Sequence, residues 1–205
     1  MYEFKTNITE IIDRAENVKS FRFKKPNDVT FSPGQWFFLE INTPKGLLKK
    51  PFSFSSSPTE NFLEFTKRLT QSDLSKYLCN DAKVGGEVFI RMPLGNLTFS
   101  GEYPKIALLS GGIGITPFKS IIKYATDKKL SSDIVLFYSS RDEENIIFKD
   151  ELNEMEKNNS NFHVIHTLTD EKTCPPNWTG SKGIICDESI KKYVPDYKER
   201  IFYVC

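Results

Sequence analysis

The stretch Ser110–Pro117 constrains the fold of this chain more than any other. It reads Ser-Gly-Gly-Ile-Gly-Ile-Thr-Pro and lies between the apolar run 106–109 and a helical pattern. That pattern has apolar residues at 118, 121, 122 and 125, while Lys119 and Lys123 lie off the apolar stripe. Thr116 is expected to cap this helix, and Pro117 suits its first turn, where a missing N–H costs nothing.

A strand, a glycine turn and a helix N-terminus together present free backbone N–H groups and the positive end of a helix dipole, which favours phosphate binding. The turn differs from the dinucleotide fingerprint of the Rossmann fold, because Pro117 stands where the third glycine is expected. Taken alone, the turn is equally consistent with a tight turn that binds nothing.

Composition excludes several classes of protein. The 205 residues are 39% hydrophobic, which argues against disorder, and the net charge of +1 provides no basic field for nucleic acid. The chain has no apolar run long enough to span a membrane and no signal peptide, so a soluble, cytoplasmic protein is expected. No metal site is predicted, because the four cysteines are scattered, and His163 and His166 would point to opposite faces of a strand.

Residues 1–100 are expected to form a small antiparallel β-barrel domain, because short β-rich runs alternate there with turn signals. The runs are Lys5–Ile12, Val18–Lys24, Gln35–Ile41, Pro51–Ser55, Phe62–Leu69 and Glu87–Arg91. One helical turn interrupts them, with Ser72 as its N-cap and Leu74, Tyr77 and Leu78 on its apolar face.

Residues 105–205 are expected to form a second, α/β domain with a parallel sheet, because strand and helix patterns alternate there. Strands are predicted at 105–109, 133–139, 162–168 and 201–204, and helices at 117–127 and 147–157. A further helix is expected to be capped by Asp187.

Motifs along nearly the whole chain resemble, in the same order, those of the ferredoxin–NADP reductase superfamily. Lys50-Pro51-Phe52-Ser53 resembles its flavin-binding R-x-Y-S motif, and Gly111–Pro117 is similar to its G-G-x-G-x-T-P nucleotide loop. The remaining matches are Pro33-Gly34-Gln35, Ser72–Leu78, Val84–Glu87, Pro93-Leu94-Gly95, Trp178-x-Gly180-x-x-Gly183 and the final Tyr203-Val204-Cys205.

The resemblance implies a flavin site on the barrel. Ser53 would donate a hydrogen bond to flavin N5, and Phe52 would stack on the ring in place of the usual tyrosine. Lys50 replaces an arginine that clamps a flavin phosphate, so it keeps the charge but loses the bidentate fork. Other residues expected to contact the flavin are Pro51, Thr66, Lys67, Arg68, Ser72, Leu74 and Ser75. The expected flavin is FAD, with FMN as the alternative, and Lys67 and Arg68 are equally consistent with a solvated strand edge.

The resemblance also implies a nucleotide site in the second domain. Gly111, Gly112, Gly114, Thr116 and Pro117 would hold the pyrophosphate of NADH or NADPH. Ser140 and Arg141 would lie near the adenosine ribose, without deciding between the two nucleotides. Cys205 would sit beside the nicotinamide and the flavin and help to orient hydride transfer.

The expected function is therefore a flavoprotein oxidoreductase that takes hydride from NAD(P)H and passes electrons to a separate acceptor, such as a ferredoxin or an oxygenase component. The sequence stops where the family pattern continues past Cys205, so a truncated C-terminus is expected. Two alternatives stay open: a reductase of free flavin, and a non-catalytic flavin-binding subunit.

Overall fold

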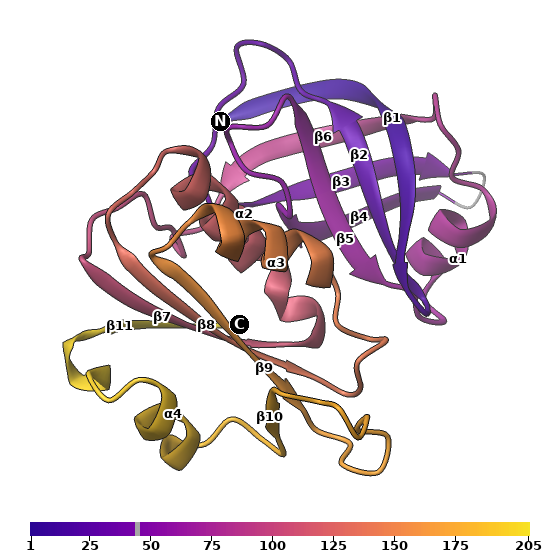
Figure 1. Cartoon of the computed structure of the whole chain (residues 1–205). Coiled ribbons are helices and arrows are strands. Elements are labelled where there is room, and N and C mark those ends of the chain that lie inside the picture. The colour runs from indigo at the N-terminus through magenta and orange to yellow at the C-terminus, as the bar shows by residue number, and fades with distance from the viewer. Residues whose placement is uncertain (44–45) are drawn as a thin grey trace.

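The N-terminal half forms one curved antiparallel sheet in the computed structural model, which describes residues 1–43 and 46–205 (Figure 1). Its strand order is β4-β3-β6-β1-β2-β5. The strands are β1 (Tyr2–Ala15), β2 (Val18–Lys24), β3 (Trp36–Thr43), β4 (Gly46–Ser53), β5 (Phe62–Arg68) and β6 (Glu87–Leu94), and helix α1 spans Asp73–Asn80.

This sheet curls into a partly open barrel because its two edge strands meet. Just past β4, the Ser55 backbone N–H donates to the Glu64 carbonyl on β5, at 2.8 Å. Along β3 inward and outward residues alternate, as expected for a strand with one buried face. The inward face is rich in phenylalanine: Phe37, Phe54 and Phe65 are fully buried and pack around one another.

The C-terminal half is built on a parallel sheet with the order β10-β9-β8-β7-β11, so the strand order reverses at β7. The strands are β7 (Lys105–Gly111), β8 (Asp133–Ser140), β9 (Phe162–Leu168), β10 (Ser181–Lys182) and β11 (Ile201–Val204). The helices are α2 (Ile115–Asp127), α3 (Lys149–Asn158) and α4 (Asp187–Tyr193). In Figure 1, α2 and α3 lie between this sheet and the barrel, while α4 lies on the other face.

The expected fold class, an antiparallel barrel followed by a parallel α/β half, is confirmed by this topology. The strands at Val18–Lys24 and Phe162–Leu168 have the predicted bounds. The two-residue strand β10 was not predicted, because it is too short to show a period.

Two predicted helix caps are wrong. Helix α2 begins at Ile115, directly after a 3₁₀ turn at Gly112–Gly114, so Thr116 lies inside the helix. The Thr116 hydroxyl donates to the Ile113 carbonyl at 3.2 Å and caps no N–H. Asp187 is the first residue of α4 rather than its cap, and the N-cap position belongs to Cys186.

The two halves pack against each other. Phe99 and Val18 belong to the same buried apolar cluster as the residues of α2 and the parallel sheet. The Tyr203 hydroxyl donates to the Thr98 carbonyl at 3.1 Å. In the part of the chain that the structure describes, no helix has the length and apolar character needed to cross a membrane.

Candidate functional site

The end of β4 presents an aromatic ring and a free hydroxyl. Phe52 is half-buried and packs on Phe65 of β5, with 4.4 Å between the ring centroids. Ser53 is half-buried, and within the described residues its hydroxyl makes no hydrogen bond. Pro51 is exposed beside them. The strand therefore leaves a hydroxyl donor and an aromatic face available to a ligand.

Three cations lie on the neighbouring strands β4 and β5, namely Lys50, Lys67 and Arg68. Burial lowers the pKa of Lys67, and the charge of Lys50 lowers it further. Lys67 donates to the Arg68 carbonyl at 3.2 Å. Among residues 1–43 and 46–205, Lys50, Lys67 and Arg68 form no ion pair with a carboxylate. Like charges without counter-ions favour an anion such as a phosphate at this place.

Thr66 directly precedes Lys67 on β5, but its side chain points into the protein interior. It is buried, and its hydroxyl is hydrogen-bonded to the hydroxyls of Ser20 at 2.7 Å and Ser55 at 2.9 Å. The structure therefore places the Thr66 side chain inside the protein, which leaves only its backbone for a flavin contact.

The predicted cap of α1 is confirmed. The Ser75 N–H donates to the Ser72 hydroxyl at 3.3 Å. Leu74 and Ser75 are buried, and the Ser75 hydroxyl bonds to Ser72 at 2.9 Å, so these side chains stabilise the helix start. Backbone N–H groups are what the α1 N-terminus offers to a phosphate. Figure 1 shows α1 at the end of the barrel away from α2, so the structure does not bring it to the glycine turn.

The glycine turn combines open space with a tight contact. A Cβ added at Gly111 or Gly112 would meet no atom within 4 Å, and Gly112 has a φ of +51°. A Cβ at Gly114 would lie 2.5 Å from the Cys205 carbonyl oxygen. Gly111 and Gly112 therefore leave room for a ligand to approach the backbone, whereas Gly114 is needed for packing against the end of the chain.

Tyr138 of β8, which sequence reasoning did not single out, supports this turn. Its hydroxyl donates to the Gly112 carbonyl at 3.1 Å. Burial raises the pKa of Tyr138 to about 12, although the nearby charge of Arg68 acts in the opposite direction. The phenol therefore stays a hydrogen-bond donor at any ordinary pH. Its only sequence signal was a tyrosine near the end of an apolar strand.

Cys205 lies against the same turn through its backbone. Its N–H donates to the Leu109 carbonyl at 3.0 Å, and its carbonyl accepts from the Gly111 N–H at 3.2 Å. Desolvation raises the pKa of the Cys205 thiol, so the sulfur stays neutral at ordinary pH. Pro117 and Thr116 are buried in the first turn of α2, behind the glycines.

Ser140 is the last residue of β8 and Arg141 follows it, at the same edge of the sheet as the glycine turn. Ser140 is buried, and its carbonyl accepts from the Thr169 N–H at 2.9 Å. Arg141 is exposed and forms no ion pair within the described residues. Only Arg141 of this pair therefore projects its side chain into solvent.

These two groups of residues converge. Strand β5, which carries Lys67 and Arg68 and lies beside β4, contacts the 3₁₀ turn Gly112–Gly114, so these two cations lie on the strand that meets the open glycine turn. The unpaired cations and the open space over Gly111 and Gly112 fit two phosphate-bearing ligands that meet at the boundary between the two halves.

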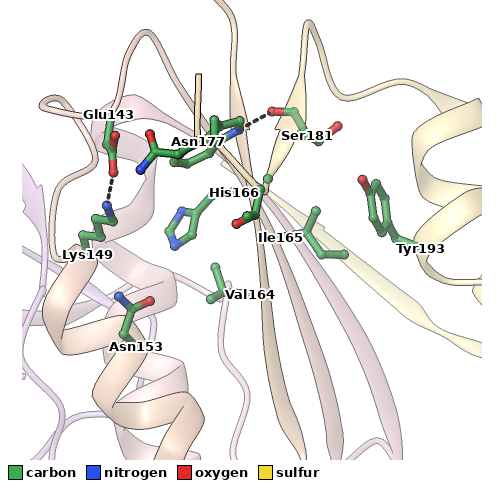
Figure 2. Close-up of a pocket in the computed structure, with 12 residues that line it drawn as sticks. Glu143, Lys149, Asn153, Val164, Ile165, His166, Asn177, Ser181 and Tyr193 are labelled. Carbon is green, nitrogen blue, oxygen red and sulfur yellow. Dashed lines mark hydrogen bonds and ion pairs between the residues drawn. The ribbon is translucent and has the colours of Figure 1, made fainter. Parts of the chain in front are cut away.

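A separate cavity of about 400 Å³ lies beside β9, between α3 and the segment 177–181 (Figure 2). His166 faces it, near Lys149, which pairs with Glu143. Both ring nitrogens of His166 are buried and lack a hydrogen-bond partner among the described residues. Burial lowers the pKa of His166 to about 4, and the charge of Lys149 adds to this shift. The ring is therefore neutral at physiological pH.

Comparison with known proteins agrees with both halves of the site. The family model described as oxidoreductase FAD-binding domain matches residues 5–99, and the one described as oxidoreductase NAD-binding domain matches residues 108–205.

Among curated relatives, the glycine betaine monooxygenase reductase subunit of Chromohalobacter salexigens is 30% identical over 204 residues, which covers 96% of this chain and 55% of the relative. The NADH-cytochrome b5 reductase 1 of Aspergillus terreus is 28% identical over 202 residues, which covers 92% of this chain and 67% of that protein. The chain thus spans about half the length of the first of these relatives.

Among solved structures, a ferredoxin NADP+ reductase from Neisseria gonorrhoeae with bound FAD and NADP superimposes with a TM-score of 0.82 at 20% identity. The match covers 100% of this chain and 85% of that one, so the two share a fold.

Proposed function

Because the chain belongs to the ferredoxin–NADP reductase superfamily, we propose that it is an NAD(P)H-dependent flavin reductase of an electron-transfer system. Residues 1–100 would form the FAD-binding domain and residues 105–205 the NAD(P)-binding domain. Electrons would leave for a separate acceptor, such as a ferredoxin or an oxygenase component. The relative named as a monooxygenase reductase subunit supports such an acceptor.

One observation carries this proposal: β5, which bears the unpaired cations Lys67 and Arg68, contacts the open glycine turn of the other half. Bound FAD supplies the chemistry, since it accepts a hydride and releases electrons singly. The protein supplies binding and orientation.

On the flavin side, Lys50, Lys67 and Arg68 would neutralise phosphate charge, because they have no carboxylate partners among the described residues. The Ser53 hydroxyl would donate a hydrogen bond at the flavin N5 edge, and Phe52 would cover the ring face. Backbone N–H groups at the start of α1, held by Ser72, would contribute to phosphate binding.

On the nucleotide side, the backbone of Gly111, Gly112 and Gly114 would hold the pyrophosphate, and the turn is kept in place by Tyr138. Arg141 would approach the adenosine ribose. The neutral thiol of Cys205 would lie beside the nicotinamide and orient it by contact. A cytoplasmic location is part of the same proposal, as expected for a reductase supplied with NAD(P)H.

The test is the visible absorbance spectrum of the purified protein, recorded anaerobically before and after addition of NADH or NADPH. A flavin band that bleaches supports the proposal, and the two bleaching rates give the nucleotide preference. A flavin band that neither nucleotide bleaches would contradict it. A colourless protein that reduces added flavin would instead identify a free-flavin reductase, which the exposed Lys50 in place of an arginine favours.

A further inference from the structure

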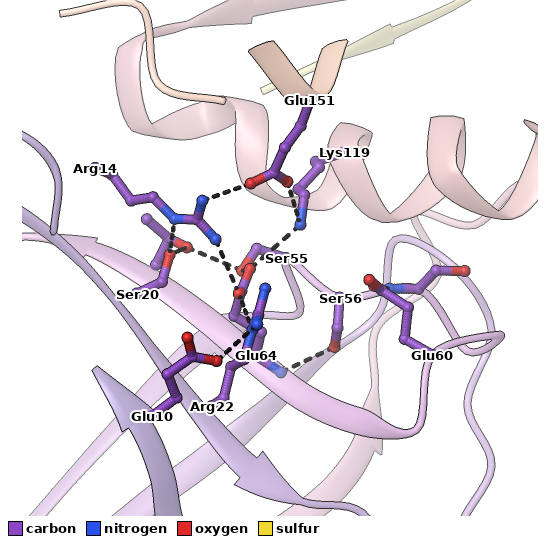
Figure 3. Close-up of polar contacts among 12 residues, drawn as sticks. Glu10, Arg14, Ser20, Arg22, Ser55, Ser56, Glu60, Glu64, Lys119 and Glu151 are labelled. Carbon is purple, nitrogen blue, oxygen red and sulfur yellow. Dashed lines mark hydrogen bonds and ion pairs between the residues drawn. The ribbon is translucent and has the colours of Figure 1, made fainter. Parts of the chain in front are cut away.

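A cluster of charges with a buried centre joins the barrel to the nucleotide half (Figure 3). We call it the Glu64 cluster, and it consists of three carboxylates and three cations: Glu10, Arg14, Arg22, Glu64, Lys119 and Glu151. The side chains of Glu64 and Lys119 are 0% and 3% exposed. Charged groups are almost never so deeply buried unless they are paired, so each depends on the other and on its neighbours.

The Glu64 carboxylate is contacted from both halves of the chain. Its Oε1 lies 3.3 Å from Nζ of Lys119, on α2. Its Oε2 lies 3.1 Å from Nη2 of Arg14 and 2.9 Å from Nε of Arg22, on the barrel. Burial alone would raise the pKa of Glu64, but the charges of Lys119 and Arg14 outweigh it and hold this pKa below its usual value.

Glu151 of α3 closes the cluster on the nucleotide side. Its Oε2 lies 3.0 Å from Nζ of Lys119, and its Oε1 accepts a hydrogen bond from Arg14. Lys119 therefore bridges two carboxylates, one from each half, and Arg14 bridges the same two carboxylates from the barrel side.

A chain of hydroxyl groups completes the network on the barrel. Arg14 Nε donates to Ser20 at 2.8 Å, and Ser55 donates to Glu64 at 2.8 Å. Thr66 lies between them, 2.7 Å from Ser20 and 2.9 Å from Ser55. Since each hydroxyl has one proton, a single direction satisfies all of them: Ser20 donates to Thr66, and Thr66 donates to Ser55. The hydroxyl chain thus runs from a cation to a carboxylate.

The residues of this network lie next to the residues proposed to bind the two cofactors. Ser55 follows Ser53 by two positions, and Glu64 lies on β5, which also carries Lys67 and Arg68. On the other half, Lys119 lies on α2, whose N-terminus is the glycine turn. One buried ion pair therefore connects the flavin strands to the helix that holds the nucleotide turn.

Phe148 fixes the two bridging cations. It is a non-glycine residue in the left-handed region, with φ +63°, at the start of α3. Arg14 lies 4.8 Å and Lys119 4.7 Å from its ring centroid. A buried phenylalanine in this conformation costs free energy, so the surrounding structure must hold it there.

We propose that Glu64 and Lys119 are positioning residues: their ion pair sets the orientation of the nucleotide turn toward the flavin strands and so sets the rate of hydride transfer. This inference rests on the function proposed above. A displacement of about 1 Å between reacting groups costs roughly 100-fold in rate, so a connection between the two binding elements bears directly on turnover.

The test is the limiting rate of flavin reduction by NADH or NADPH in anaerobic stopped-flow experiments on Glu64→Gln and Lys119→Met. We expect this rate to fall about 10- to 100-fold, while FAD retention and the nucleotide Kd change less than about twofold. Lys119→Arg keeps the charge, so its limiting rate of flavin reduction should be intermediate between those of Lys119→Met and the unchanged protein. A merely structural role would instead lower FAD retention and rate together.

The matched control is Lys105→Met. Lys105 also bridges two carboxylates, Asp196 at 2.8 Å and Glu199 at 2.6 Å, but all three belong to the nucleotide half. Its rate of flavin reduction should equal that of the unchanged protein.

A second readout is independent of turnover. Spin labels at the exposed positions of Val84→Cys and Ile184→Cys, with the four native cysteines replaced by serine, report the distance between the halves. The distance distribution should be narrow, and it should broaden or shift in Lys119→Met and in Glu64→Gln.

Several outcomes overturn the inference. The inference is wrong if Glu64→Gln and Lys119→Met fold and reduce flavin at the rate of the unchanged protein. It is also wrong if the distance distribution is the same in these variants as in the unchanged protein. If Glu64→Gln and Lys119→Met fail to fold, a Lys119→Arg variant with unchanged rate and distances refutes it. If neither nucleotide reduces the flavin of the unchanged protein, the proposed function fails, and the distance distribution alone then decides whether the ion pair sets the orientation.

Discussion

The two glycines Gly111 and Gly114 should respond in opposite ways to the same substitution. A Cβ at Gly114 would lie 2.5 Å from the Cys205 carbonyl oxygen and 2.7 Å from its carbonyl carbon, so Gly114→Ala must push Cys205, which directly follows β11, away. The backbone of Gly114 is right-handed helical, at φ −62°, which alanine tolerates, so the cost is steric. Overpacking of this kind costs about 1–3 kcal/mol.

Gly111→Ala is the matched case without a protein clash. Gly111 is extended, at φ −122°, and its Cβ would meet nothing within 4 Å. Alanine at such a position stabilises a protein by about 0.4–1 kcal/mol, because the unfolded chain loses freedom. The same methyl group would occupy the space in which a pyrophosphate must approach the backbone. We therefore expect the nucleotide Kd to rise about tenfold or more, which corresponds to about 1.4 kcal/mol.

The assays are urea unfolding followed by circular dichroism, and titration of the flavin spectrum with NADH or NADPH. Gly114→Ala should lower the free energy of unfolding by about 2 kcal/mol and Tm by about 4–8 °C. Gly111→Ala should unfold at a urea concentration no lower than that of the unchanged protein, and yet it should bind nucleotide more weakly. Unchanged nucleotide affinity in Gly111→Ala would refute the assignment of this open space to the pyrophosphate. Unchanged stability in Gly114→Ala would refute the steric role of Gly114.

Three further substitutions test single side chains. Tyr138→Phe removes the hydrogen bond to Gly112 and should cost about 1 kcal/mol of stability and raise the KM for nucleotide; equal KM values at matched FAD content would contradict this. His166 has a pKa of about 4 in the folded protein, so its contribution to stability is complete above about pH 6.5 and falls as the pH is lowered. We therefore compare how far the free energy of unfolding, measured in urea, falls between about pH 7 and pH 5. This fall should be about 2 kcal/mol smaller in His166→Phe than in the unchanged protein. Ser53→Ala should keep FAD but slow its reduction about 10-fold or more in stopped-flow experiments, and a rate within twofold would exclude its proposed hydrogen bond.

The sequence predicted the features that depend on local pattern. Period and turn signals gave the bounds of β2 and β9, and Ser72 was correctly assigned as the cap of α1. The start of α2 was predicted wrongly because a 3₁₀ turn formed by Gly112–Gly114 directly precedes the helix. Glycines carry no side-chain pattern from which such a turn could be predicted.

Features that depend on packing between the halves were not predicted. Lys119 lies off the apolar stripe of α2, which for an isolated helix indicates solvent, but the barrel covers that face and buries it. Glu64 stands inside the apolar run Phe62–Phe65, and an acidic residue in such a run was the available signal. Its partners Arg14 and Lys119 are distant in sequence, so no local pattern could identify them.

The hydrogen bonds of Cys205 have a consequence for biosynthesis. Residues 201–205 leave the ribosome long after Leu109 and Gly111, and they close the backbone around those two residues. Because domains fold largely as units from the N-terminus, the barrel can be complete while the glycine turn still lacks its neighbouring strand. A nascent chain should thus acquire the capacity to hold flavin before it can bind nucleotide.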